Sequence, residues 1–177
     1  DPVRMRVAAA GNVYIQLNPA APTVAKDAMF TMDIDIVAGV QEVDTVEVHI
    51  DFDPLYLQVV DAGGSPVSTI EGSGVLPIEL LNSVDNGSGG IDYAAGMLVG
   101  TNPSGTFELA TIRFRALWGT GGASRPLTFV HELPRKTDVN YGGGSVLAGA
   151  EDGSVTITGR AICDSYTHAD EIGRAHV

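Results

Sequence analysis

The sequence of 177 residues contains little cysteine and little positive charge. Cys163 is its sole cysteine, so no disulfide can form within the chain. Ten Lys and Arg residues stand against 22 Asp and Glu residues, and the net charge at pH 7 is -12. This argues against binding to nucleic acid, which requires a basic patch, and against binding to an anionic membrane surface. The acidity is compatible with a basic or polar partner, and equally with solubility alone.

Long apolar runs and amphipathic helices are also missing. Although 44% of the residues are hydrophobic, no stretch approaches the length needed to span a bilayer. No convincing amphipathic helix of ten residues occurs before residue 160. The 22 Gly and 9 Pro make the chain rich in turns, but not enough for a disordered composition. The length is sufficient for one domain with a real core.

The sequence does contain apolar and polar residues that alternate with a period of two. Such runs, regular or partial, occur at residues 13–17, 30–36, 46–52, 57–60, 75–84, 91–95, 107–116, 127–130 and 155–158. Each run predicts a strand with one face on a core and the other in water. About nine short strands separated by turn signals predict an all-β sandwich.

Three local irregularities are expected. The apolar positions of residues 107–116 switch from odd to even numbers near Ala110-Thr111, which predicts a β-bulge. Residues 85–90, Asp-Asn-Gly-Ser-Gly-Gly, predict a hairpin loop because Asn and Gly tolerate positive φ. Residues 53–57 predict one short turn of helix.

The ends of the chain differ in pattern from its middle. We expect residues 1–11 to be a leader or linker, residues 12–159 to form the sandwich, and residues 160–177 to be a polar tail, linker or appended extension. The chain opens at Asp1-Pro2 without a basic segment followed by an apolar one. We therefore expect a fragment of a longer polypeptide, with no signal peptide in it.

Several segments, in order, resemble the cohesin family, the protein-binding modules of bacterial scaffoldins. Residues 46–60, VEVHIDFDPLYLQVV, are similar to the cohesin segment v-x-l-x-y-D-P-x-x-L-x-v-v. Residues 109–116, LATIRFRA, are similar to l-a-x-i-x-F-x-a, and residues 152–157, DGSVTI, to d-G-s-v-t-v. Residues 24–27 correspond to the turn v-x-x-G-d, with Lys26 where the family has Gly.

The resemblance covers roughly residues 12–158 and implies a nine-stranded jelly-roll β-sandwich. It also implies that one sheet face binds a dockerin module, with strong contributions from the third and sixth strands. Several cellulose-binding modules share the jelly-roll architecture, so the fold alone does not separate protein binding from carbohydrate binding.

The third strand supplies the first set of candidate contact residues. The resemblance places Thr45 and Glu47 where the family has Asn and Asp, and His49 and Asp51 continue the same outward row. A carboxylate there can accept hydrogen bonds from Ser, Thr, Lys or Arg of a partner helix. The alternative is that these four residues are merely the solvated face of an amphipathic strand.

The segment from residue 91 to 97 resembles the sixth strand. Asp92, Ala94 and Gly96 point outward if the apolar residues between them point inward. Cohesins often carry a larger apolar residue in this row. The small residues here either weaken a family-typical dockerin contact or leave room for a bulkier partner.

Carbohydrate binding is the main alternative, because sugar-binding faces stack pyranose rings on exposed aromatic side chains. The candidates for such stacking are Trp118, Tyr56, Tyr141 and Tyr166. Trp118 follows a predicted strand and precedes a glycine-rich turn, so capping of the core is the preferred explanation for it.

Catalysis has weaker support in the sequence. Asp33 and Asp35, like Asp51 and Asp53, are two residues apart on one strand face, about 6.6 Å by strand rise. That separation overlaps the spacing of glycosidase carboxylate pairs. Outward carboxylates on amphipathic strands more often serve solubility, and the chain lacks both the G-x-S-x-G and the H-E-x-x-H motif. We therefore expect no enzyme.

Metal binding is also weakly indicated. Asp85, Asn86 and Asp92 flank the glycine-rich loop and could offer oxygen ligands to Ca²⁺, but the EF-hand spacing is missing and a plain hairpin explains them better. A transition metal would have Cys163, His168 and His176 as candidate ligands, and a polar tail accounts for them more simply. No cofactor is otherwise expected.

The sequence thus predicts a non-catalytic, extracellular or surface-exposed cohesin-like module with a dockerin-type partner. The setting of polysaccharide degradation or surface attachment comes wholly from the resemblance. A carbohydrate-binding module and a structural spacer or adhesion module are the alternatives.

Overall fold

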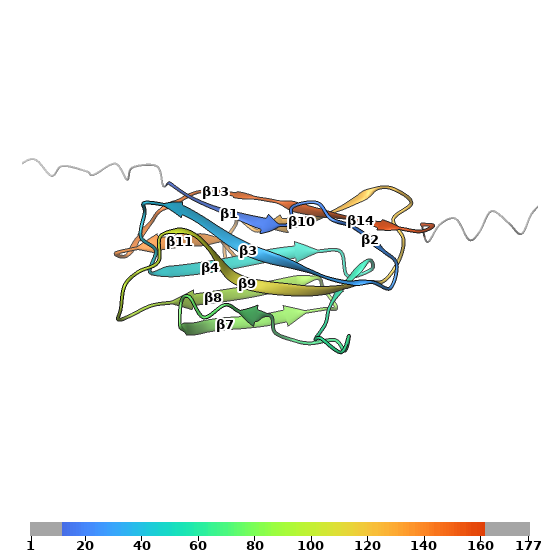
Figure 1. The fold of residues 1–177 in the computed structure, drawn as a ribbon, viewed down its shortest axis with the longest axis horizontal. Coiled ribbons are helices and arrows are strands. Elements are labelled where there is room, and N and C mark those ends of the chain that lie inside the picture. Colours follow the sequence, from blue (N-terminus) through green and yellow to red (C-terminus); the bar gives the residue numbers. More distant parts are fainter. Residues whose placement is uncertain (1–11, 162–177) are drawn as a thin grey trace, which may run out of the picture.

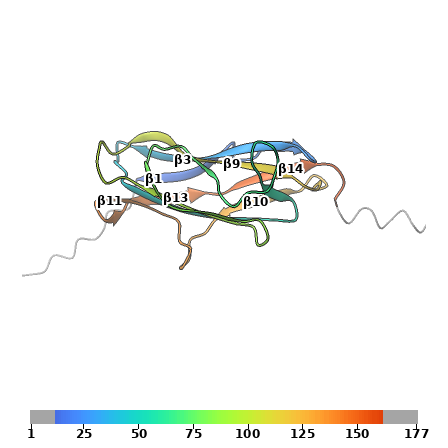
Figure 2. The same cartoon turned by 90° about the horizontal axis from the view of Figure 1, so that it is seen from below.

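The structure, a computed structural model, describes residues 12–161 as a sandwich of two β-sheets (Figure 1). These residues form fourteen strands, and none of them lies in a helix that is long and apolar enough to cross a membrane. Turned by 90°, the two sheets are seen edge-on as stacked layers (Figure 2). The expected all-β sandwich is confirmed.

The first sheet has six strands. Its order is β13 (Leu147–Glu151), β1 (Val13–Asn18), β3 (Met29–Gly39), β9 (Gly105–Ala116) and β5 (Leu57–Val59), with β6 (Glu71–Gly72) also paired to β9. Most neighbours are antiparallel, whereas β1 and β13 run parallel. The long pairing of β3 with β9 forms the centre of this sheet.

The second sheet has eight strands and carries the candidate site. Its path is β12 (Gly144–Ser145), β11 (Asp138–Tyr141), β4 (Thr45–Phe52), β10 (Ser124–Phe129), β14 (Gly153–Thr158) and β2 (Thr23–Ala25). The strand β8 (Gly90–Gly96) pairs with β4 and with β7 (Ile78–Asp85). Because β8 occupies one edge of β4, the strands β11 and β10 lie one after the other along its opposite edge.

The core lies between the sheets and follows from the period-two alternation. One face of each long strand is buried, as in Val46, Val48 and Ile50 of β4. Phe114 near the C-terminal end of β9 stacks on Phe30, with ring centroids 5.7 Å apart. Burial of such aliphatic and aromatic rows provides the main stabilisation of a sandwich and fixes which face of each strand points outward.

The structure contains all nine predicted strand runs and adds five short strands, namely β2, β6, β11, β12 and β13. The predicted bulge is confirmed: Ile34 faces Ala110, whereas Asp35 faces Glu108, so Leu109 is the extra residue. Leu109 and Ala110 are consequently both buried. This bulge moves the apolar side of β9 from odd to even positions, as the sequence indicated.

The hairpin loop at residues 85–90 is also confirmed. The carboxylate of Asp85 accepts hydrogen bonds from the N–H groups of Gly87 and Ser88, which closes the loop. Gly89 has a φ of +80° and accepts the N–H of Phe52 through its carbonyl oxygen at 2.8 Å. The loop between β7 and β8 is thereby tied to the end of β4.

Residues 53–57 form the expected single turn. The carbonyl of Asp53 accepts the N–H of Leu57 at 3.0 Å, and its carboxylate accepts the N–H of Leu55.

Candidate functional site

The register of β4 with β8 brings the predicted contact residues together on one surface. The pairs are Thr45 with Gly96, Glu47 with Ala94, His49 with Asp92, and Asp51 with Gly90. Alternate residues of β4 are buried in the core, so this row faces away from it. We call the surface made by Thr45, Glu47, His49, Asp51, Asp92, Ala94 and Gly96 the β4–β8 face. All seven predicted partner-binding residues therefore lie side by side, although the sequence distributes them over two separate segments.

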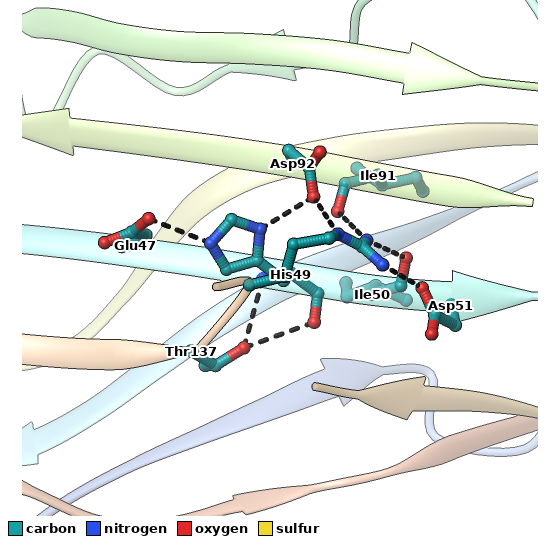
Figure 3. Close-up of polar contacts among 8 residues, drawn as sticks. Glu47, His49, Ile50, Asp51, Ile91, Asp92 and Thr137 are labelled. Atoms are coloured by element: carbon teal, nitrogen blue, oxygen red, sulfur yellow. Dashed lines mark hydrogen bonds and ion pairs between the residues drawn. The ribbon is translucent and has the colours of Figure 1, made fainter. Parts of the chain in front are cut away.

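His49 lies at the centre of this face but is covered, with only 3% of its surface exposed. Its Nδ1 is 2.7 Å from Oδ1 of Asp92, and its Nε2 is 2.9 Å from Oε1 of Glu47 (Figure 3). Because ionised carboxylates only accept hydrogen bonds, a doubly protonated ring can donate to both at once. The expectation that His49 is free to contact a partner is wrong. It holds Glu47 and Asp92 in position instead.

Arg135 adds a positive charge to the β4–β8 face and was not identified from the sequence. Its Nε donates to Oδ1 of Asp92 at 2.7 Å, and its Nη1 donates to Oδ1 of Asp51 at 2.6 Å. Burial alone would raise the pKa of Asp92, but hydrogen bonds from His49 and Arg135 and the charge of Arg135 outweigh it and lower the pKa. Burial would likewise lower the pKa of Arg135, but the two aspartates raise it. The ionised forms are therefore mutually stabilised.

Thr137 anchors the segment that carries Arg135. This segment, residues 130–137, leaves the sheet between β10 and β11. The hydroxyl of Thr137 accepts the N–H of His49 at 3.0 Å and donates to its carbonyl at 3.2 Å (Figure 3). The N–H of Val130 also donates to that carbonyl. The Thr137 side chain thus binds the backbone of β4 at a point where neither β10 nor β11 pairs with it. This contact holds residues 130–137 against the β4–β8 face.

The ion pairs of Arg135 make a pH-dependent contribution to stability. A folded pKa of Asp92 below its ordinary value of 3.8 means that the native state binds fewer protons than the unfolded state. This stabilisation is present above about pH 4 and is lost as the pH falls through the folded pKa. We expect Arg135→Gln to lower the thermal midpoint at pH 7, and we expect the difference from the unmodified chain to shrink on acidification. Thermal unfolding between pH 2.5 and 7 measures it.

A matched control distinguishes the loss of the Arg135 ion pairs from the effect of a one-unit change in net charge on the thermal midpoint. Lys136→Gln makes the same charge change one residue away, where Nζ is 3.6 Å from a carboxylate oxygen of Asp138 and the side chain is about half exposed. We expect its midpoint shift to be smaller at pH 7. Equal shifts for both variants would show that the Arg135 contacts add nothing specific.

Ala94 and Gly96 lie on the β4–β8 face as predicted, but both are buried. Around Gly96 the neighbours are close: a Cβ there would lie 3.4 Å from the carbonyl oxygen of Asp44, 3.5 Å from the hydroxyl of Thr45 and 3.6 Å from Cδ1 of Leu80 on β7. Their outward orientation on the strand therefore does not make them solvent-exposed, and whether their small size weakens a partner contact or leaves room for a bulkier partner stays a prediction. What remains is a hollow of about 110 Å³ lined by Thr45, Ile78, Leu80, Gly96, Met97 and Leu98.

The aromatic residues proposed for sugar stacking do not form one platform. Tyr56 is buried, and the guanidinium of Arg125 lies 4.0 Å above its ring and donates to its hydroxyl, so the expected exposed ring is wrong. Trp118 is exposed beside Lys26 near β2, whereas Tyr141 ends β11 and donates to the Glu42 carboxylate. Figure 1 places β2 and β11 at opposite ends of the molecule.

The oxygen ligands suggested for Ca²⁺ all have hydrogen-bond partners within the chain. The amide of Asn86 donates to the carbonyls of Val59 and Val67, and its oxygen accepts the N–H of Val59. Asp85 closes its own loop, and Asp92 binds His49 and Arg135. Between residues 12 and 161, no group of three or more His, Cys, Asp or Glu side chains is arranged to hold a metal.

Other candidates from the sequence have structural partners or lie elsewhere. Asp33 accepts the hydroxyl of Thr111, and desolvation together with the charge of Asp33 raises the pKa of Asp35. Asp51 and Asp53 bind Arg135 and the turn after β4, respectively. Cys163, Tyr166, His168 and His176 lie outside the described residues.

Solved structures resemble this chain over most of its length. They include CaCohA2 from Clostridium acetobutylicum, with a TM-score of 0.67, 16% identity and coverage of 86% of this chain and 94% of that chain. A type III cohesin module from the cell-surface anchoring scaffoldin ScaE of Ruminococcus flavefaciens has a TM-score of 0.63, 14% identity and coverage of 90% and 95%, respectively. A chain of a type II cohesin–X-dockerin complex from Acetivibrio cellulolyticus has a TM-score of 0.60 and 15% identity, with coverage of 82% of this chain and 99% of that chain.

No protein-family model and no curated protein matches the sequence. At such low identity, the structural likeness establishes the fold. The chain has the cohesin jelly-roll fold, as the ordered motifs indicated.

Proposed function

We propose that this chain is a non-catalytic module that binds a dockerin-type partner through the β4–β8 face. The observation that carries this proposal is the pairing of β4 with β8, which gathers the residues predicted from the cohesin motifs on one outward surface. The structural neighbours support the choice of partner, because one of them is a cohesin–X-dockerin complex. An extracellular or surface location and a setting of polysaccharide degradation or surface attachment belong to the same proposal.

The β4–β8 face has the rigidity that binding to a folded partner requires. Its backbone is paired on both edges of β4, and its inner residues are fully buried. Glu47 has a side chain that is 47% exposed, and His49 holds one of its carboxylate oxygens. The other oxygen remains available to a Lys, Arg, Ser or Thr of the partner at little entropic cost, since the side chain is already oriented.

The test is capture of dockerin-type modules. A yeast-displayed panel of such modules, including the X-dockerin of the Acetivibrio cellulolyticus complex, would be incubated with the full chain. We expect at least one module to bind, and Glu47→Arg to weaken its affinity at least tenfold while circular dichroism and a cooperative thermal transition show that the variant is still folded. Reversal of a charge that the partner pairs with causes the loss.

Glu151→Arg is the control, since Glu151 is an exposed glutamate on β13 of the other sheet. It should leave capture unchanged. Failure of every module to bind, or equal losses for both variants, would contradict the proposal. Retention of the chain on insoluble cellulose or xylan, abolished by Trp118→Ala, would favour carbohydrate binding instead.

A further inference from the structure

A hollow of about 350 Å³ lies on the six-stranded sheet rather than on the β4–β8 face. It forms where the chain leaves the edge of β9. Val60 donates its N–H to the carbonyl of Arg113, and pairing with β9 resumes only where Glu71 lies opposite Thr111. The residues in between, which we call the 61–70 loop, enclose the hollow together with β9. Its volume is at the lower end of the roughly 300–1,000 Å³ typical of small-molecule sites, so it suits one small ligand.

Side-chain amides from the β7 hairpin hold the 61–70 loop in place. The amide nitrogen of Asn82 donates to the carbonyl of Ile70 at 2.9 Å, and its oxygen accepts the N–H of Ile70 at 2.8 Å. The amide of Asn86 donates to the carbonyl of Val67 at 3.0 Å. The loop is thereby fixed to the rest of the fold at two points. The hollow is formed before a ligand arrives, as is usual for small-molecule sites.

The floor of the hollow is aliphatic. Val60 and Ile70 are buried, and Val67 is partly buried. None of the described residues that line the hollow is aromatic. A ligand with an aliphatic group would remove water from this floor and gain hydrophobic stabilisation. A sugar ring would find no aromatic face on which to stack.

The other lining residues include charges of both signs that are not paired with one another. Arg113 alternates with buried residues of β9, so its side chain lies on the outer side of the sheet, where it lines the hollow together with Asp61 and Glu71. None of the six ion pairs between described residues includes any of these three. One carboxylate oxygen of Asp61 accepts the N–H of Ser65 at 2.9 Å, which orients the group and leaves its other oxygen for a ligand.

An aliphatic floor with both charges around it matches a ligand that carries both charges on an aliphatic skeleton. A guanidinium donates two parallel hydrogen bonds to a carboxylate, and a carboxylate accepts hydrogen bonds from an ammonium group. We infer that the hollow binds a free aliphatic amino acid. The ligand carboxylate binds Arg113, and the ligand ammonium group binds Asp61 and Glu71. The ligand side chain packs on Val60 and Ile70.

The balance of charges narrows the class of ligand further. Asp61 and Glu71 outweigh Arg113, so the hollow has one net negative charge. A ligand with a carboxylate alone is repelled by the two acidic side chains, and a ligand with an ammonium group alone leaves the guanidinium unpaired. A neutral sugar provides no counter-charge to any of the three. This inference goes beyond the proposed function, because the hollow and the β4–β8 face belong to different sheets.

Titration of five small ligands into the ¹⁵N-labelled full chain tests the inference. The ligands are L-leucine, glycine without the side chain, N-acetyl-leucine without the ammonium group, leucinamide without the carboxylate, and glucose. We expect L-leucine to shift the amide signals of Thr69 and Glu71 saturably in the millimolar range, and each of the others to bind at least fivefold more weakly. Raising NaCl from 50 to 500 mM should weaken L-leucine severalfold because the ionic contacts are screened.

Three outcomes of this titration would overturn the inference. They are the lack of a saturable shift with L-leucine, equal binding of N-acetyl-leucine or leucinamide, and tighter binding of glucose. The last of these would assign the hollow to a sugar instead.

Variants of the chain provide the controls. Arg113→Gln and Glu71→Gln should each weaken L-leucine at least fivefold. Lys136→Gln and Glu151→Gln remove the same charges outside the hollow and should leave binding unchanged. Circular dichroism and a cooperative thermal transition show which variants are folded, and Glu71 is exposed, so its variant remains informative if Arg113→Gln does not fold.

Unchanged binding of L-leucine to folded Glu71→Gln would overturn the inference. Capture of a dockerin-type module by Glu71→Gln should equal that by the unmodified chain, since the hollow lies on the other sheet. Failure of every module to bind would contradict the proposed function and leave the leucine titration as a separate result. The two proposals are therefore tested independently.

Discussion

Gly89→Ala should destabilise the domain by at least about 3 kcal/mol, a large part of the stability of an ordinary domain. Gly89 has a φ of +80°, and a left-handed conformation costs a residue with a Cβ about 1–2 kcal/mol. A Cβ would also lie 2.0 Å from the carbonyl oxygen of Phe52 and 2.8 Å from Cδ of Pro54. The first of these atoms belongs to the backbone, so the end of β4 or the hairpin loop must move. Urea denaturation followed by circular dichroism measures the loss.

Gly74→Ala is the matched control for conformational strain. Gly74 has nearly the same φ, +78°, but a Cβ at this position would have no atom within 4 Å apart from those of its immediate chain neighbours. We expect it to cost only about 1–2 kcal/mol. If the two variants lost equal stability, the close contact between the hairpin loop and the end of β4 would not exist as described.

Thr137→Val should cost about 1–3 kcal/mol because it leaves the buried N–H of His49 without an acceptor. Valine has nearly the shape of threonine, so the change removes the hydroxyl without opening a cavity. The carbonyl of His49 keeps its hydrogen bond from Val130 at 2.9 Å, so the loss concerns mainly the donor. Denaturant unfolding at pH 7 gives the free energy of unfolding.

Thr137→Ser distinguishes the hydroxyl from the packing of the methyl group. Serine keeps the bond to His49 and loses one methyl group, which costs about 0.8 kcal/mol. A serine variant less stable than the valine variant would mean that packing, rather than the hydrogen bond, holds residues 130–137 against β4.

The sequence was informative wherever one side of a strand is buried. Period-two alternation located β1, β3, β4 and β9, and the switch of parity in β9 located its bulge. The short strands were missed because pairing, rather than burial, determines them. In β13, for example, residues Leu147–Glu151 are only partly buried and carry two small side chains.

The candidate site was predicted in part. Alternation determined that His49 points away from the core, but it cannot indicate what covers the outer side of a strand. The segment of residues 130–137 packs against the strand through Thr137, which lies 88 residues after His49 in the chain and binds its backbone, and no local pattern links the two. Arg135 was missed for the same reason, since its contacts with Asp51 and Asp92 are created only by the tertiary fold.

Between β10 and β11, residues 130–137 leave the sheet. The chain therefore pairs with β4 through the two strands and reaches the outer face through the segment between them. The flanking strands keep their register with β4, and one threonine hydroxyl closes the gap. The exposed residues 131–134 inside the interruption can therefore be exchanged without touching the contacts of Arg135 and Thr137 or the register of the flanking strands with β4.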